Sequence, residues 1–410
     1  MEPSQSGATS SRNVVLTVLV AALGYFVDIY DLILFSIVRT KSLASLGLQG
    51  DALLDRGVLL LNMQMIGMLI GGVLWGVLGD RRGRLSVLFG SIFMYSAANI
   101  GNGLVQSVEQ YAVLRFVAGI GLAGELGAGI TLVSEVMTKE TRGYGTTLVA
   151  SVGILGAVVA ALVGDSFSWR TAYFVGGGMG LALLLLRVGL FESGMFESAR
   201  TREAARGDFF LLFRSAARAR RYLSIIFMAV PIWYVIGILV TFSPEIAKAL
   251  GTEPLPQAGR AVLFCYIGLS LGDLASGALS QVLRSRRRVI ALFLGLTALG
   301  VALYFTLGGA SLVGFYAICG VLGFAAGYWA VFVTMASEQF GTNIRATATT
   351  TAPNFVRGAV VLLTLSFRAL VGPLGVVGAA VAVGVATLAV AVIALGSLEE
   401  TYGKDLDFVE

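Results

Sequence analysis

Long apolar stretches alternate with short polar segments along almost the entire chain of 410 residues. Each stretch reaches the about 20 mostly apolar residues with which an α-helix crosses a bilayer. With 57% hydrophobic and 13% charged residues, an ordinary soluble globular protein is excluded. The pattern therefore predicts an all-α membrane protein with 12 transmembrane helices, at residues 14–37, 57–79, 85–106, 110–134, 144–164, 171–190, 222–243, 260–283, 288–308, 311–335, 346–368 and 373–396.

Most of the 29 Lys and Arg residues fall on the side of the predicted membrane that also holds both chain ends. Because basic residues gather in cytoplasmic loops, we expect cytoplasmic termini and a multi-pass protein of a bacterial inner membrane. The positive charge then reflects topology and contact with lipid head groups, and it requires no nucleic-acid partner. The polar segment 191–221 is expected to be a basic cytoplasmic linker between an N-terminal bundle at 1–190 and a C-terminal bundle at 222–410. This linker is either simply solvated or binds anionic lipid.

Charged residues at the ends of the predicted helices recur in the second half of the chain. Glu135 and Arg142 are seven positions apart, and so are Glu338 and Arg345, 203 positions further on. A duplicated membrane unit of two pseudo-symmetric six-helix bundles explains the repetition, and transporters use such repeats to build one central site. Opposite charges at cytoplasmic helix ends can hold one conformation and release it as the halves move. We therefore predict a cytoplasmic gate, with ordinary interfacial anchors as the alternative, formed by Asp80, Arg81, Arg84, Glu135, Arg142, Glu338 and Arg345.

Several of these segments resemble the major facilitator superfamily. The run Gly76–Arg84 matches its signature loop between helices two and three, and Arg115–Gly121 is similar to its helix-four signature. Gly24–Asp31 resembles the first helix of the metabolite:proton symporter branch, close to the sugar porters, although that branch usually carries Glu where this chain has Asp28. The resemblance implies two lobes that alternate access to a central site. The proline of the antiporter signature is missing from Gly153–Ala157, which disfavours drug efflux.

Ionisable groups inside the predicted spans are rare, costly and therefore candidates for function. Counting about 1.5 Å per residue, Asp28 and Asp31 lie about 21 and 25 Å above the cytoplasmic face, and Arg115 about 22 Å. The chain has no His, so carboxylates are the default proton carriers. We predict proton coupling by Asp28, Asp31 and Arg115, in which the arginine holds an ionised acid. Related symporters pair the same two helices; the alternative is a static ion pair that fixes their packing.

Arg357, roughly 18 Å up helix eleven, is the leading substrate contact, with Asn354 one turn away. A guanidinium grips a carboxylate with two hydrogen bonds, which favours an anionic or zwitterionic substrate. Arg357 could instead pair internally with Asp273 or Glu125. Aromatic residues near the bilayer centre suggest a cavity, although each one alone is more often a packing residue. The further candidate lining residues are Tyr25, Tyr30, Gln64, Glu125, Trp233, Tyr234, Tyr266 and Tyr328.

The sequence thus predicts a monomeric secondary active transporter in the lipid bilayer, one that imports a small organic anion or zwitterion together with protons. A proton-driven efflux antiporter is the alternative within transport, and sodium coupling stays open. A membrane receptor or sensor would need a soluble signalling domain, and the tail from Glu399 to Glu410 is short. An intramembrane enzyme would need a metal cluster or a nucleophile–base pair, and no catalytic residue, cofactor or metal is predicted.

Overall fold

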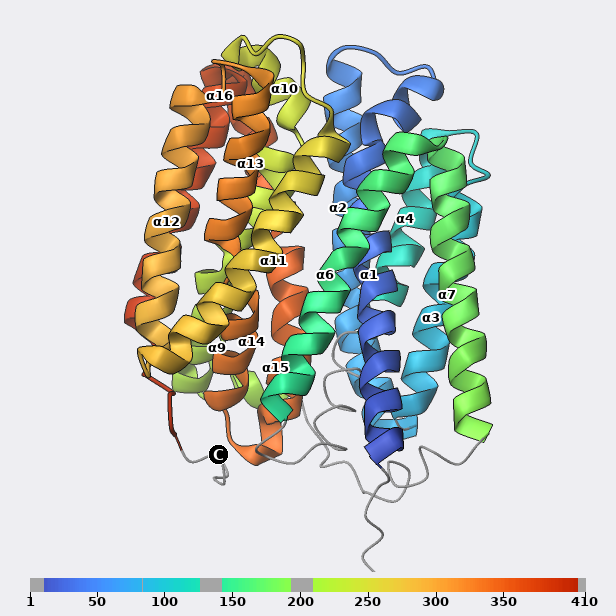
Figure 1. Cartoon of the computed structure of the whole chain (residues 1–410), viewed down its shortest axis with the longest axis vertical. Coiled ribbons are helices and arrows are strands. Elements are labelled where there is room, and N and C mark those ends of the chain that lie inside the picture. Colours follow the sequence, from blue (N-terminus) through green and yellow to red (C-terminus); the bar gives the residue numbers. More distant parts are fainter. Residues whose placement is uncertain (1–10, 83, 126–141, 193–208, 405–410) are drawn as a thin grey trace, which may run out of the picture.

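The computed structural model describes residues 11–82, 84–125, 142–192 and 209–404, and these residues form helices joined by short connections (Figure 1). The predicted all-α class is confirmed. The elements are α1 Ser11–Ser45, α2 Asp51–Arg82, α3 Arg84–Asn102, α4 Val108–Leu122, α6 Arg142–Ser166, α7 Trp169–Glu192, η1 Phe209–Phe213, α9 Ala216–Tyr234, η2 Val235–Val240 (a π-helix), α10 Ser243–Leu250, α11 Ala258–Val282, α12 Arg286–Leu307, α13 Leu312–Ala326, α14 Trp329–Glu338, α15 Thr342–Gly358 and α16 Val360–Gly396.

The helices gather into two lobes, the N-lobe of α1 to α7 and the C-lobe of α9 to α16 (Figure 1). The packing in one lobe is repeated in the other. Helix α2 lies against α4 as α11 lies against α13, and α3 lies against α7 as α12 lies against α16. Glycines allow these close approaches, because a β-carbon on Gly67 or Gly268 would clash with the backbone of the neighbouring helix. The repetition is the structural counterpart of the duplicated charge pattern in the sequence.

Contacts between the lobes come from few helices. Helix α6 lies beside α11 in the centre of the view, and α2 packs on α15 and α16 (Figure 1). Helix α1 also contacts α11. Side chains of α1, α11 and α15 can therefore meet at the centre of the molecule.

Nine helical segments of the described residues are long and apolar enough to cross a membrane, and the longest of them covers Thr347–Gly396. Non-helical backbone at Gly375 interrupts this longest segment. The total of 12 spans and the boundaries of the basic linker stay predictions, since 126–141 and 193–208 lie outside the described residues.

The predicted span at 311–335 corresponds to the apolar segment Leu312–Glu338, but this segment is not one continuous helix. The structure divides it into α13 and α14 at Gly327 and Tyr328. The neighbouring helix α11 explains the break, because a β-carbon on Gly327 would lie 2.6 Å from the backbone nitrogen of Asp273. Asp273 Oδ1 then accepts a hydrogen bond from the backbone N–H of Ala330 at 3.1 Å, which satisfies one group freed by the break.

Candidate functional site

A buried ion pair joins the two lobes near the middle of the molecule. Asp28 of α1 is 0% exposed and Arg357 of α15 is 1% exposed, and Arg357 Nη2 lies 3.8 Å from Asp28 Oδ2. The pair is loose: within the described residues neither Asp28 oxygen accepts a hydrogen bond, and Arg357 Nε and Nη1 donate none. Buried charges with unused hydrogen-bonding capacity are costly. The arrangement therefore leaves both groups able to bind a further partner.

Aromatic side chains from both lobes surround this pair. Tyr25, one turn before Asp28 on α1, interacts with Arg357 through its hydroxyl. The Arg357 guanidinium lies over the Trp329 ring, 5.7 Å from its centroid, and its charge also acts on Tyr266 of α11. The surroundings of Arg357 thus combine one cation with flat apolar faces.

Asn354, one turn before Arg357 on α15, also reaches the other lobe. Its amide nitrogen donates to the carbonyl oxygen of Ala123 at 3.1 Å and to that of Thr350 at 3.3 Å. Its Oδ1 is buried without a partner among the described residues. Asn354 therefore links the lobes through its nitrogen and keeps its oxygen available.

The structure differs from the predicted pairing of the helix-one acids with Arg115. Arg115 donates a hydrogen bond to Gln64 and lies 4.7 Å from the centroid of the Phe35 ring. Asp31 is buried, and neither of its oxygens accepts a hydrogen bond among the described residues. Its interaction with Arg115 is electrostatic, without a direct hydrogen bond. Asp31 follows Asp28 by three residues, so its side chain leaves the helix in a different direction and points to α7. There it lies so close to Gly176 that a β-carbon on this glycine would clash with the Asp31 carboxylate.

The remaining candidates of the N-lobe occupy other positions. Glu125 binds Arg187, with Oε2 accepting from Nη1 at 3.0 Å, so it is no partner of Arg357. The sequence pattern does not indicate this second buried pair, because Arg187 falls near the end of its helix, where basic residues usually face the cytoplasm. A buried acid such as Glu125 requires a basic partner, so its position inside a predicted span indicates that an arginine or lysine of another helix lies beside it.

Three candidate tyrosines satisfy their hydroxyl groups on the backbone. Tyr30 donates to Ala172 at 2.9 Å, Tyr234 to Ala380 at 2.8 Å and Tyr328 to Met228 at 3.0 Å. Trp233 is buried in the hydrophobic core of the C-lobe. These contacts are those of packing residues.

For the predicted cytoplasmic gate, the structure describes the side chain of Glu338. Glu338 Oε1 lies 3.2 Å from Nη2 of Arg286, the first residue of α12. Asp80, Arg81, Arg84, Arg142 and Arg345 lie at helix ends, but their side chains, and Glu135 altogether, lie outside the described residues.

The opposite end of the molecule holds contacts that the sequence analysis missed. Arg39 of α1 is fully buried, lies 2.7 Å from a carboxylate oxygen of Glu245 on α10, and stacks over the Phe242 ring. Thr241 donates to Ser36 at 3.0 Å, and Thr364 donates to Asn62 at 2.6 Å. Each contact joins the N-lobe to the C-lobe. In the structure the lobes are therefore held together at the end opposite the chain termini.

Two lobes of membrane-spanning helices around a buried central site define a secondary transporter fold. A family model described as Major Facilitator Superfamily matches residues 14–375, and the chain belongs to this family. It is an integral membrane protein that crosses the bilayer several times, and it is a transporter and not an enzyme.

Relatives and a solved structure agree with this assignment. The chain is 28% identical over 364 residues to a putative niacin/nicotinamide transporter of Bacillus subtilis (strain 168), covering 85% of this chain and 88% of the relative. It is 28% identical over 295 residues to the 3-(3-hydroxy-phenyl)propionate transporter of Escherichia coli (strain K12), covering 70% and 71%. A crystal structure of a D-xylose-proton symporter shares the fold, with a TM-score of 0.69 at 18% identity over 96% of this chain and 100% of that one.

Proposed function

We propose that the protein imports a small organic anion, preferably an aromatic carboxylate, by proton-coupled symport across a bacterial inner membrane. The observation that supports this proposal is the buried pair of Asp28 and Arg357, which come from opposite lobes. When the lobes move relative to each other, the distance between Asp28 and Arg357 changes. A pair of residues within one lobe would keep its distance.

The proposed coupling rests on competition for one cation. Arg357 balances the charge of Asp28 in the empty carrier. When a substrate carboxylate forms a bidentate hydrogen bond with the Arg357 guanidinium, Asp28 loses its ionic partner. An unpaired buried charge costs several kcal/mol. Uptake of one proton by Asp28 removes that cost. The carrier then reorients with substrate and proton together, and loss of the proton to the cytoplasm returns Asp28 to Arg357 and expels the substrate.

The preference for an aromatic carboxylate follows from the walls of the site. Trp329 offers a flat face 5.7 Å from the guanidinium, and the hydroxyl groups of Tyr25 and Tyr266 lie within reach of its charge. A planar ring can stack on such a face while its carboxylate binds Arg357. The names of two relatives, for niacin and for a hydroxyphenylpropionate, support this choice. A zwitterion would bind the same cation but would need an additional partner for its positive group.

The contacts at the end opposite the termini support alternating access. The Arg39–Glu245 pair and the Thr241–Ser36 and Thr364–Asn62 hydrogen bonds must separate before this end can open. With the termini in the cytoplasm, the structure corresponds to a carrier that is closed toward the outside. The charged helix ends from Asp80 to Arg345 are the proposed gate on the cytoplasmic side.

Uptake into proteoliposomes tests the function. Purified protein is reconstituted, an inward proton gradient is imposed, and radiolabelled nicotinate, 3-phenylpropionate and glycine betaine are offered. We expect accumulation of an aromatic carboxylate above equilibrium, accompanied by alkalinisation of the outside medium. Proton movement opposite to the substrate would instead identify an efflux antiporter, and accumulation driven only by a sodium gradient would overturn proton coupling.

A further inference from the structure

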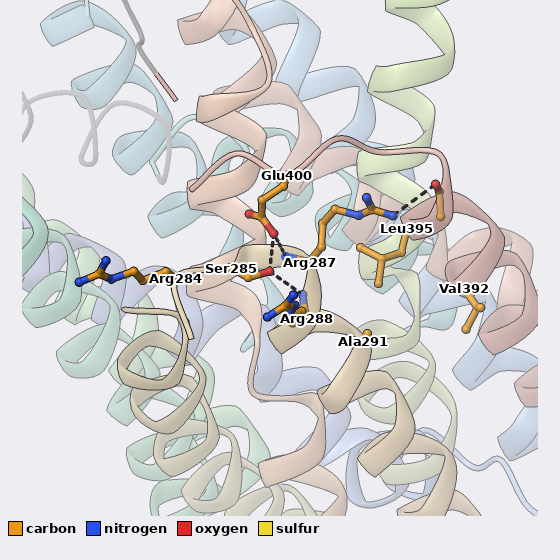
Figure 2. Close-up of a pocket in the computed structure, with 9 residues that line it drawn as sticks. Arg284, Ser285, Arg287, Arg288, Ala291, Val392, Leu395 and Glu400 are labelled. Atoms are coloured by element: carbon orange, nitrogen blue, oxygen red, sulfur yellow. Dashed lines mark hydrogen bonds between the residues drawn. The ribbon is translucent and has the colours of Figure 1, made fainter. Parts of the chain in front are cut away.

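A pocket of about 590 Å³ opens where α12 begins and α16 ends, at the end of the molecule that holds the last described residues (Figure 2). Its lining divides into two kinds of residue. Arginines form one part, and apolar side chains of the two membrane-spanning helices form the other. The residues that matter here are Arg284, Arg287, Arg288, Ala291, Val392 and Leu395.

The arginines of this pocket have unused hydrogen-bonding capacity. Among the described residues, no hydrogen bond or ion pair of the Arg284 or Arg288 side chain occurs, and both residues are exposed. Arg287 makes one long contact, from Nη2 to the carbonyl oxygen of Gly396 at 3.4 Å, and its Nε is buried without a partner. Arg286, in contrast, is already bound to Glu338. Figure 2 shows the Arg284 side chain extending away from the other two arginines, so the pocket presents the guanidinium groups of Arg287 and Arg288 to a ligand.

The one acid of the pocket is already engaged with the helix terminus. Glu400 accepts hydrogen bonds from Ser285 Oγ and from the backbone N–H of Arg287 at 3.2 Å (Figure 2). It also accepts one from the backbone N–H of Arg286 at 2.9 Å. Burial opposes ionisation of this group, but these hydrogen bonds outweigh it and lower the pKa of Glu400 to about 2. Glu400 is thus ionised and occupies the N-terminus of α12. Arg287 and Arg288 against one carboxylate leave the pocket positive.

The apolar part of the pocket continues onto the surface that faces the bilayer. Val392 is 58% exposed and the neighbouring Ile393 73%, and Leu292 on α12 is 46% exposed. A ligand that fits must place an anionic group among the arginines and an apolar chain along α12 and α16. Such a ligand lies at the boundary between the membrane core and its polar surface, which is where these helices end.

We propose that this pocket binds an anionic phospholipid, with the phosphate at Arg287 and Arg288 and an acyl chain along α12 and α16. Basic pockets between spanning helices on the cytoplasmic side recognise anionic head groups. The lining does not include Arg357, and the site goes beyond the proposed transport function. It fits the predicted cytoplasmic position of this end, because the cytoplasmic leaflet carries the anionic lipids.

Native mass spectrometry of the delipidated full chain tests the proposal, using phosphatidylglycerol and phosphatidylcholine of the same acyl chains. We expect preferential retention of phosphatidylglycerol, reduced about fivefold for each arginine removed, so that the Arg287→Gln/Arg288→Gln double variant loses about 25-fold. Arg56→Gln, an exposed arginine of α2 outside the pocket, is the matched control and should bind as the wild type does.

Arg284→Gly is a second control, in the same turn, because the Arg284 side chain extends away from Arg287 and Arg288 and glycine suits its φ of +48°. This variant should melt no lower than the wild type and should keep its phosphatidylglycerol retention. Equal retention of the two lipids, or unchanged retention in the Arg287→Gln/Arg288→Gln variant, would overturn the proposal. Inorganic phosphate that displaces phosphatidylglycerol and raises the melting temperature equally would mean that the site binds a soluble phosphate and not a lipid.

Discussion

Asp28 and Asp31 lie one turn apart on α1 and both are fully buried, but they face different helices. Asp28 faces Arg357 across the lobe interface, whereas Asp31 faces α7 inside the N-lobe, within the field of Arg115. Only the first pair changes when the lobes move. Depth in the membrane therefore identifies both acids as costly, but rotation about the helix axis decides which of them can couple to transport.

The largest expected effect tests the cationic member of the cross-lobe pair. Arg357→Ala removes the carboxylate grip and leaves Asp28 as an unpaired charge, so we expect anion affinity to fall about 100-fold or more and transport to cease. Arg357→Lys keeps the charge but loses the planar fork, and it should bind with intermediate affinity. Equilibrium binding of a labelled aromatic carboxylate measures both variants, and Arg56→Ala serves as the exposed control. Unchanged affinity in Arg357→Ala would remove Arg357 from the site.

The acid of the same pair is expected to control coupling. Asp28→Asn cannot exchange a proton, so accumulation driven by a proton gradient should be lost, while exchange of labelled for unlabelled substrate should persist. The neutral side chain also leaves Arg357 free, so anion affinity at alkaline pH should rise. Proteoliposome accumulation and exchange assays separate the two outcomes, with the exposed Glu109→Gln as the control. Accumulation at the wild-type level would contradict the role of Asp28.

The contacts at the far end of the lobes give a smaller effect. Glu245→Gln leaves the buried Arg39 without its ionic partner, which disfavours the closed outer end. We expect about a tenfold increase in labelling of a Ser36→Cys probe by an impermeant thiol reagent, corresponding to about 1.4 kcal/mol. Labelling that is equal with and without Glu245→Gln would show that this pair does not hold the lobes together.

The within-lobe acid provides the contrast. Asp31→Asn removes a buried charge without breaking a hydrogen bond, so it should change thermal stability and leave the number of protons carried per substrate unchanged. Melting temperature and proton–substrate stoichiometry are measured on the same preparation. Loss of coupling in Asp31→Asn, equal to that in Asp28→Asn, would erase the distinction between the two acids.

The smallest expected effect is the pH dependence of stability that comes from Glu400, a residue outside the membrane-spanning helices. Because the pKa of Glu400 is lowered from 4.5 to about 2, its contribution to stability is fully present above pH 4.5 and is lost as the pH falls toward 2. Glu400→Gln should therefore lower the melting temperature slightly near neutral pH and converge with the wild type near pH 2. A pH dependence of transport between pH 5 and 8 that persists in Glu400→Gln cannot arise from this group.

The fold and the chemistry of the site were predictable to different extents. The length of the apolar stretches predicts spanning helices, and the repeated spacing of Glu and Arg predicts two related halves. Both features can be predicted because they depend on local sequence. The partner of each buried charge depends on helix rotation and tilt. Glu125 meets Arg187, and Arg39 meets Glu245 some 206 positions away, and no local pattern encodes either contact. The break at Gly327 likewise depends on the approach of α11.

The most direct test of the proposed competition is the number of protons bound when substrate binds. Titration of the purified protein with an aromatic carboxylate, in buffers of different ionisation enthalpy, gives this number. We predict that the wild type takes up about one proton per anion near neutral pH, where Asp28 gives up Arg357, and that Asp28→Asn takes up none. Tight anion binding without proton uptake by the wild type, or with the same uptake by Asp28→Asn, would contradict the account.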